Sequence, residues 1–218
     1  YVTLNILALI VINTLFRGVL SLLAGIVFAI VSSSLISSYL YLLSNIINNN
    51  RITLQSFKDG FKEYLWKVYG IFFIAWLASY LLSTISSIFG KRIILLTDII
   101  KILALVLLNA LPEVIYQKHY SSADSIMYAI EFIRENWLNW FLPNIIFTVI
   151  LYFLTGKIFT NLFTIYIDTP MVISIEGAVR YIVAQTIFSY MMIYRGYLFK
   201  ILSTSTPRKR AFMRNLYE

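Results

Sequence analysis

The stretch VYGIFFIAWLASYLLSTISSIF, residues 68–89, decides how the rest of the chain is interpreted. None of its side chains is charged at neutral pH, and apolar or aromatic residues occupy most positions. As an α-helix it would be about 33 Å long, which matches the ~30 Å hydrocarbon core of a bilayer. The stretch therefore predicts a membrane-spanning helix.

The composition of the whole chain agrees with a membrane protein. Of its 218 residues, 60% are hydrophobic and 13% are charged, and the mean hydropathy is +0.79. Soluble domains are about half apolar and a quarter charged. The absence of cysteine excludes disulfides, thiolate metal sites and a cysteine nucleophile. We therefore expect an all-α fold, a polytopic integral membrane helical bundle.

Apolar runs predict six spans in a single transmembrane domain, residues 1–204, followed by a basic tail at residues 205–218. The first run is short for a bilayer, so it would need residues upstream of Tyr1 or a thin site. The predicted spans are residues 2–16, 19–47, 68–89, 93–116, 140–166 and 171–199.

The basic residues predict the orientation of these spans. With six spans, the segments 48–67 and 117–139 and the tail lie on one side of the membrane, and most Lys and Arg residues belong to that side. Cytoplasmic loops carry an excess of Lys and Arg in membrane proteins. We therefore expect both the N- and the C-terminus to be cytoplasmic.

Two cytoplasmic segments, residues 54–67 and 123–139, have apolar residues at helical spacing and charged residues elsewhere. This pattern predicts amphipathic helices that lie flat at the membrane interface or pack on the ends of the spans. Thr53 can cap the first helix, and Ser121 or Ser122 the second. The apolar stripes are Leu54, Phe57, Phe61, Tyr64 and Val68, and Ile126, Ile130, Ile133, Trp137 and Trp140.

Smaller features refine this picture of the spans. Several serines at residues 32–38 have small side chains, which suit a close helix–helix contact. Pro112 lies near the cytoplasmic end of the fourth span and lacks an amide proton, so we expect it to kink or fray that helix. Trp66, Trp137 and Trp140 lie near the inner interface, where tryptophans commonly anchor a membrane protein.

The two amphipathic segments also suggest an internal repeat. A shift of 69 residues superimposes their apolar positions and places Gly60 on Ala129, although almost no residues are identical. The pattern is then a span, a cytoplasmic amphipathic helix and a span, twice in the same orientation, as in parallel transporter repeats. Alternatively, the helical period alone aligns any two amphipathic helices.

Three stretches resemble a known family. These are LPEVIYQ at residues 111–117, SSADSIMYAIEFIRENW at 121–137 and NNNRITLQSFKDGFKEYLWKVYG at 48–70. Over about residues 30–200 the chain is similar to the membrane region of bacterial glycerophosphodiester phosphodiesterases and to related bacterial and archaeal six-span proteins. The resemblance implies a helical bundle in a prokaryotic plasma membrane. The phosphodiesterase barrel is absent from these residues, so its chemistry is not implied.

Four charged residues inside predicted spans are candidate site residues. Asp98 and Lys101 are three residues apart, and Glu176 and Arg180 are four apart. Charges within a membrane commonly mark a site that faces the bundle interior or a water-filled cavity. One hypothesis is a four-charge cluster that lines a cavity open to the outside. The other is two intrahelical pairs near the interface, with the long basic side chains reaching towards water.

Glu113 is a candidate interfacial acid, because it follows Pro112 at the cytoplasmic end of a span. It could carry a proton, or it could cap the end of a helix. His119 is the only histidine, and one histidine cannot build a typical zinc site, so we expect it to lie in solvent. The chain has no HExxH, GxSxG or Walker sequence. We therefore expect no catalytic residue, no metal and no cofactor.

These observations predict a non-enzymatic membrane protein, either a transporter-like subunit or a scaffold or docking domain. Its partners would be the lipid bilayer and a cytoplasmic or membrane protein bound at residues 54–67 and 123–139, and not nucleic acid. A transporter predicts a polar cavity around the four charges, whereas a docking domain predicts a packed, dry bundle. The alternatives are a membrane enzyme acting on lipid or peptide, and an immunity protein against membrane-active peptides.

Overall fold

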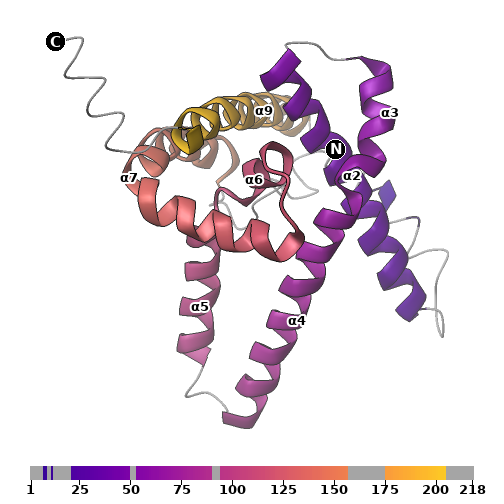
Figure 1. The fold of residues 1–218 in the computed structure, drawn as a ribbon, viewed down its shortest axis with the longest axis vertical. Helices are drawn as coiled ribbons and strands as arrows, with labels where there is room; N and C mark the ends of the chain where they lie inside the picture. The colour runs from indigo at the N-terminus through magenta and orange to yellow at the C-terminus, as the bar shows by residue number, and fades with distance from the viewer. Residues whose placement is uncertain are drawn as a thin grey trace.

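The computed structural model describes residues 7–8, 11, 21–49, 53–89, 94–156 and 175–204. These residues are helical and contain no strand, which confirms the predicted all-α class (Figure 1). The helices are α2 (Ser21–Asn49), α3 (Leu54–Glu63), α4 (Leu65–Phe89), α5 (Ile94–Leu107), α6 (Leu111–Gln117), α7 (Ser122–Thr155) and α9 (Ile175–Thr204).

The short helix α3 packs closely on α2, because serine hydroxyls of α2 donate hydrogen bonds to carbonyl groups of α3. The hydroxyls of Ser34 and Ser38 on α2 donate to backbone oxygens of α3 at 3.0 and 2.9 Å. Ser37 donates to the Gly60 carbonyl and accepts from the Tyr64 amide, at 2.8 Å for the second bond. The Gly60 and Phe61 carbonyls lie in the last turn of α3, where a helix leaves its carbonyl groups free. The serines thus form the close contact predicted for them.

Both predicted helix starts are confirmed. The Ser56 amide donates to Thr53 Oγ1 at 3.0 Å, and the Asp124 amide donates to Ser121 Oγ at 3.2 Å. A hydroxyl at this position satisfies an amide that has no partner within the helix. Ser121 is therefore the cap of α7, and Ser122 is its first helical residue.

The predicted span 93–116 is broken in two. Helices α5 and α6 meet at residues 108–110 and are bent by 41°. Pro112 lies in the first turn of α6, where its missing amide proton costs least. The bend expected near Pro112 is therefore confirmed, although the run was predicted as a single span.

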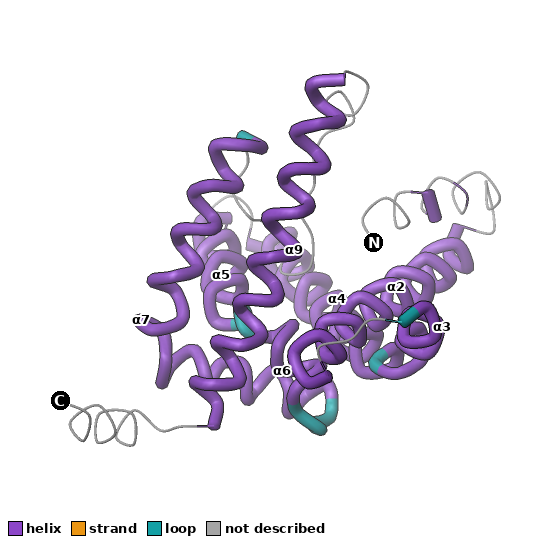
Figure 2. The backbone as a smooth tube through the Cα atoms, turned by 90° about the horizontal axis from the view of Figure 1, so that it is seen from above, coloured by secondary structure: helices purple, strands orange, loops and turns teal. Residues whose placement is uncertain are grey.

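Helix α7 joins two elements that were predicted separately. The interfacial helix 123–139 and the start of the span 140–166 form one helix, which ends at Gly156 in the left-handed conformation (φ 68°). Pro143 lies inside it, and Figures 1 and 2 show that the helix changes direction along its length. A proline removes one backbone bond and bends a helix without ending it. Residues 157–166 of the predicted span lie outside the described residues.

The helices do not all run in one direction. Helices α4 and α5 project together from the rest of the molecule in Figure 1. Helix α9 and the later part of α7 point along the line of sight there and are seen lengthwise in Figure 2. The steep angle between these two pairs distinguishes the fold from a bundle of parallel spans.

Within the described residues, three helices (α2, α4 and α7) are long and apolar enough to cross a membrane, and a fourth span results if α5 and α6 count as one. These helices support a membrane protein with several apolar helices. Six spans are not confirmed. Most of the predicted first span lies outside the described residues, and α9 is long enough but is not one of the apolar helices.

The buried faces of α3 and α7 differ from the predicted apolar stripes. On α7 only Ile133 and Trp140 of the predicted stripe are buried, whereas Trp137 is 60% exposed. On α3, Leu54 is 86% exposed. The neighbouring helices cover a face that combines small and polar residues with large apolar ones. On the first half of α7 the buried residues are Ser125, Ala129, Phe132, Ile133, Asn136 and Trp140.

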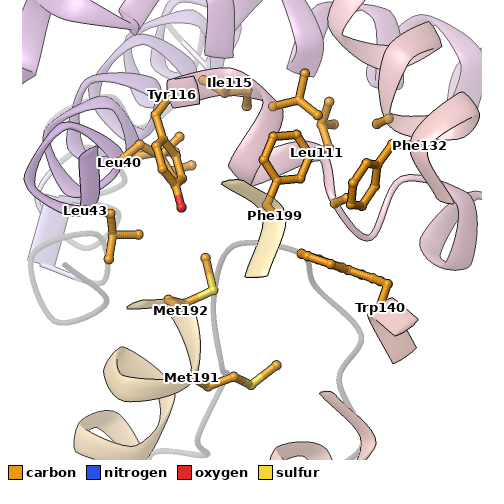
Figure 3. Close-up of a cluster of buried hydrophobic side chains, with 14 of the residues drawn as sticks. Leu40, Leu43, Leu111, Ile115, Tyr116, Phe132, Trp140, Met191, Met192 and Phe199 are labelled. Carbon is orange, nitrogen blue, oxygen red and sulfur yellow. The ribbon is translucent and has the colours of Figure 1, made fainter. Parts of the chain in front are cut away.

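The hydrophobic core lies where α2, α6, α7 and α9 meet. Figure 3 shows Leu111 of α6 beside the rings of Phe199 of α9 and Phe132 of α7, with Trp140 below them. The Phe132 and Phe199 ring centroids are 4.6 Å apart. This core surrounds the site described next.

Candidate functional site

The core contains a buried ion pair between Glu113 of α6 and Arg195 of α9. Arg195 Nε donates to Glu113 Oε1 at 2.8 Å, and Nη2 donates to Oε2 at 3.0 Å. The side chains are 5% and 0% exposed for Arg195 and Glu113. Two parallel N–H···O bonds are the strongest geometry for an arginine and a carboxylate. Each charge is therefore neutralised in a place that water does not reach.

Asn109 extends this pair to the break between α5 and α6. Its backbone carbonyl accepts a hydrogen bond from Arg195 Nη2, and its side-chain oxygen accepts from Trp140 Nε1 at 2.9 Å. The Arg195 guanidinium also lies over the Trp140 ring, 5.1 Å from its centroid. Asn109, Glu113, Trp140 and Arg195, here called the polar cluster, thus connect the break, α6, α7 and α9.

Gly196 explains how α9 comes close enough to form the polar cluster. A Cβ atom at this position would lie 2.5 Å from the Tyr116 hydroxyl oxygen and 2.0 Å from Ile47 Cδ1. Gln117 Nε2 donates to the Gly196 carbonyl at 2.8 Å. A residue without a side chain at 196 therefore lets α9 approach α2 and α6 closely, with Arg195 directed at Glu113.

A second polar contact lies at the C-terminal end of α6. Lys67 Nζ donates to the carbonyls of Ile115 and Lys118 at 2.9 and 2.8 Å. A cation at a helix C-terminus satisfies free carbonyls and complements the helix dipole. The nearby Tyr64 hydroxyl donates to the Tyr116 carbonyl at 3.4 Å, and burial raises the pKa of the Tyr64 phenol, which keeps it a neutral donor.

The structure brings together each charged pair predicted within a span. Lys101 Nζ lies 3.1 Å from Asp98 Oδ1, with side chains 65% and 58% exposed. Arg180 forms an ion pair with Glu176, and both side chains are also exposed. Each pair lies within its own helix, as in the hypothesis of two intrahelical pairs. The four-charge cluster stays a prediction.

The other predicted residues divide between surface and core. His119 is exposed, in the turn after α6. Trp66 and Trp137 are exposed, but Trp140 is fully buried in the polar cluster and is not the interfacial anchor expected from the sequence. Within the described ranges, no three potential His, Cys, Asp or Glu ligands come together to hold a metal ion.

Sequence reasoning identified Glu113 but missed Arg195 as its partner. Spacing along the sequence shows contacts between residues of one helix, whereas these two residues are 82 positions apart. A signal was present. Arg195 is the only charged residue in MMIYRGYLF, residues 191–199, and Glu113 is likewise surrounded by apolar residues.

A surface cavity of about 270 Å³ lies between the first half of α7 and the end of α9. Glu131 and Glu135 line one wall, and Ser203 and Thr204 line another. The side chains of Glu131, Glu135 and Thr204 are exposed to solvent, in contrast to those of the Glu113–Arg195 ion pair.

Comparison with known proteins adds no identification. The chain matches no protein-family model, no curated protein and no solved structure.

Proposed function

We propose that this chain is a non-enzymatic, multi-pass scaffold or docking domain of a prokaryotic plasma membrane. The observation that supports a scaffold is the polar cluster. Its charges are buried, paired and bonded to the backbone, so the cluster binds helices to one another and offers no accessible group to a substrate. A packed, dry interior is the feature expected of a docking domain.

The docking face would be formed by residues 54–67 and 123–139, as the sequence suggested. Leu54, Trp66, Met127 and Trp137 are exposed there, among charged residues. Exposed apolar side chains beside membrane helices suit the lipid interface or an apolar surface of a partner protein. The bilayer and one protein partner are therefore the proposed ligands of this face.

A second candidate, a transporter-like subunit, is favoured by the break between α5 and α6. Interrupted membrane helices form substrate or ion sites in many transporters. The bend of 41° falls inside a run that is otherwise apolar enough to cross a membrane. This function requires water to reach the interior of the helix bundle, and labelling of buried cysteines measures that access.

The proposed topology keeps six spans and two cytoplasmic termini, in agreement with the distribution of Lys and Arg. The proposed repeat is supported at one matched position, because Gly60 and Ala129, which a shift of 69 residues superimposes, are both buried. At another matched position, Val68 is buried whereas its counterpart Trp137 is exposed. A relation to the membrane region of glycerophosphodiester phosphodiesterases remains part of this proposal.

Single cysteines test the function, because the chain has no other thiol. Two cysteines replace buried residues, Ala110 at the start of α6 and Ala184 on α9. A third replaces the exposed Lys58 and is the control. For a scaffold in native membranes, a water-soluble maleimide labels Lys58→Cys only, and the buried sites react after denaturation. Labelling of Ala184→Cys in the native protein would favour the transporter.

The same cysteines test the topology. In intact cells, an impermeant maleimide should label Lys91→Cys from outside and leave Lys58→Cys and Arg134→Cys unlabelled until the membrane is opened. Labelling of Arg134→Cys from outside would exclude the six-span arrangement.

A further inference from the structure

At the break between α5 and α6, the Asn109 carbonyl accepts a hydrogen bond from a side chain and not from a backbone amide of its own helix. In an uninterrupted helix, the amide of Glu113 would donate to the carbonyl of Asn109, four residues earlier. Here that carbonyl accepts from Arg195 Nη2, and the Glu113 carboxylate holds the same guanidinium. The break therefore has a donor of its own, supplied by α9.

Two arrangements of this segment would satisfy the same carbonyl. In the bent arrangement, Arg195 is the donor. In a straight arrangement, the Glu113 amide is the donor and Arg195 is free to move. If the run of α5 and α6 spans the membrane as predicted, this carbonyl needs one of the two donors, because lipid offers none.

The local sequence is compatible with both the bent and the straight arrangement. The residues on each side of the break are apolar and helical, and the bent pair together is long enough to cross a membrane. Pro112 cannot donate to the Leu108 carbonyl, which accepts instead from the Leu111 amide at 2.9 Å. Proline thus weakens the straight arrangement, and the polar cluster stabilises the bent one.

We infer that residues 108–110 are a hinge, which the Glu113–Arg195 ion pair holds in its bent state and which straightens when Arg195 leaves. The moving element is α5, which is mostly exposed, whereas α6 is buried in the core. Helix α5 has 14 residues and is about 21 Å long, so a change of 41° would move its far end by roughly 14 Å. The inference holds for a scaffold and for a transporter alike.

Distance measurements by pulsed electron paramagnetic resonance test the hinge. Spin labels at Leu95→Cys, on the far end of α5, and Arg134→Cys, on α7, report the movement, since both positions are exposed. In the labelled parent protein, reconstituted in lipid nanodiscs, we expect one main distance. In the double variant E113Q/R195M, we expect a second population, displaced by up to about 14 Å.

The double variant separates a hinge from a merely stabilising ion pair. It leaves no buried charge unpaired, so the loss of stability should be small. It still removes the Arg195 donor from the Asn109 carbonyl. If the pair only stabilises the fold, the double variant will keep the parent distance, and that result overturns the inference.

Two further variants keep the test decisive if the double variant does not fold. Pro112→Ala restores an amide donor and should increase the second population with the polar cluster intact. Glu176→Gln removes an exposed pair on α9 and should leave the distances unchanged. An unchanged distance in P112A would also contradict the hinge.

Discussion

The molecule has two regions that bury their surfaces in different ways. The junction consists of α6, residues 122–140 of α7 and residues 191–204 of α9, packed against α2. The arm consists of α5 and residues 72–89 of α4, which project from the junction in Figure 1. Side chains on the inner face of the junction are covered by protein, among them Phe132, Trp140 and Phe199. Along the arm, aromatic residues such as Phe73, Trp76 and Tyr80 are exposed and contact mainly one another.

The comparison shows that similar apolar helices need different surroundings. In the junction, polar groups are bonded to one another, and each bond depends on the position of another helix. Along the arm, lipid can replace the protein neighbour, because hydrocarbon chains are as apolar as the side chains they cover. Substitutions should therefore have large effects in the junction and small effects on the arm.

Breaking the ion pair of the junction should have the largest effect. Arg195→Met leaves the Glu113 carboxylate buried without its partner, and we expect a loss of about 3–5 kcal/mol in the free energy of unfolding. Unfolding in detergent, followed by circular dichroism, measures this change. The double variant E113Q/R195M is the control and should recover most of the loss. A mild effect of R195M alone would mean that water reaches the pair.

Gly60→Ala should have the next largest effect, because it tests the contact between α2 and α3. A Cβ at Gly60 would lie 2.9 Å from the Ser38 Cα, and backbone cannot move aside easily. We expect a loss of about 1–3 kcal/mol in the same unfolding assay. Gly25→Ala is a matched control, since nothing lies within 4 Å of its Cβ. Equal effects of the two substitutions would show that the close contact is absent in solution.

Ser121→Ala removes the cap of α7 and should cost about 1 kcal/mol. The hydroxyl accepts from the Asp124 amide at 3.2 Å and donates to the Asp124 carboxylate at 2.6 Å. Thr84→Ala on the arm is the control, because the Thr84 hydroxyl bonds only within its own helix, to Tyr80. The two variants are compared by unfolding, and a larger loss for T84A would contradict the distinction between the regions.

Asp98→Asn should have the smallest effect if its ion pair lies near the membrane interface, as in the hypothesis of two intrahelical pairs, because water then reaches both side chains. Exposed pairs contribute at most about 1 kcal/mol, so we expect a change of about 0.5 kcal/mol or less. Glu176→Gln, which alters the other exposed pair, should behave in the same way. A large loss of folded protein in either variant would instead support the four-charge cluster.

The features that could be predicted from the sequence are those that depend on neighbours along the chain. The helix starts at Thr53 and Ser121 follow from a hydroxyl three residues before the amide it caps. The bend near Pro112 follows from a missing amide proton. Gly60 and the serines of α2 were recognised as small, and the structure uses them for a close contact.

The features that could not be predicted depend on how helices are rotated against one another. The apolar stripe of α7 included Trp137, but the neighbouring helices cover Asn136 and leave Trp137 exposed. The spacing within each helix suggested pairs for Asp98 and Glu176, but it contains no information about Glu113 and Arg195. Apolar surface on a membrane helix can face lipid or protein at similar cost, so hydrophobicity alone does not select the buried face.

The amino-acid sequence by itself determined the helical class, the membrane as the expected solvent, and the local starts and bends of the helices. These properties arise from the length of apolar runs and from short-range backbone bonding. Only the tertiary structure decided which charges meet, because Glu113 and Arg195 lie far apart in the chain and become partners when α9 packs against α6. The reason is that a charge can be buried only where another helix supplies its countercharge and hydrogen bonds.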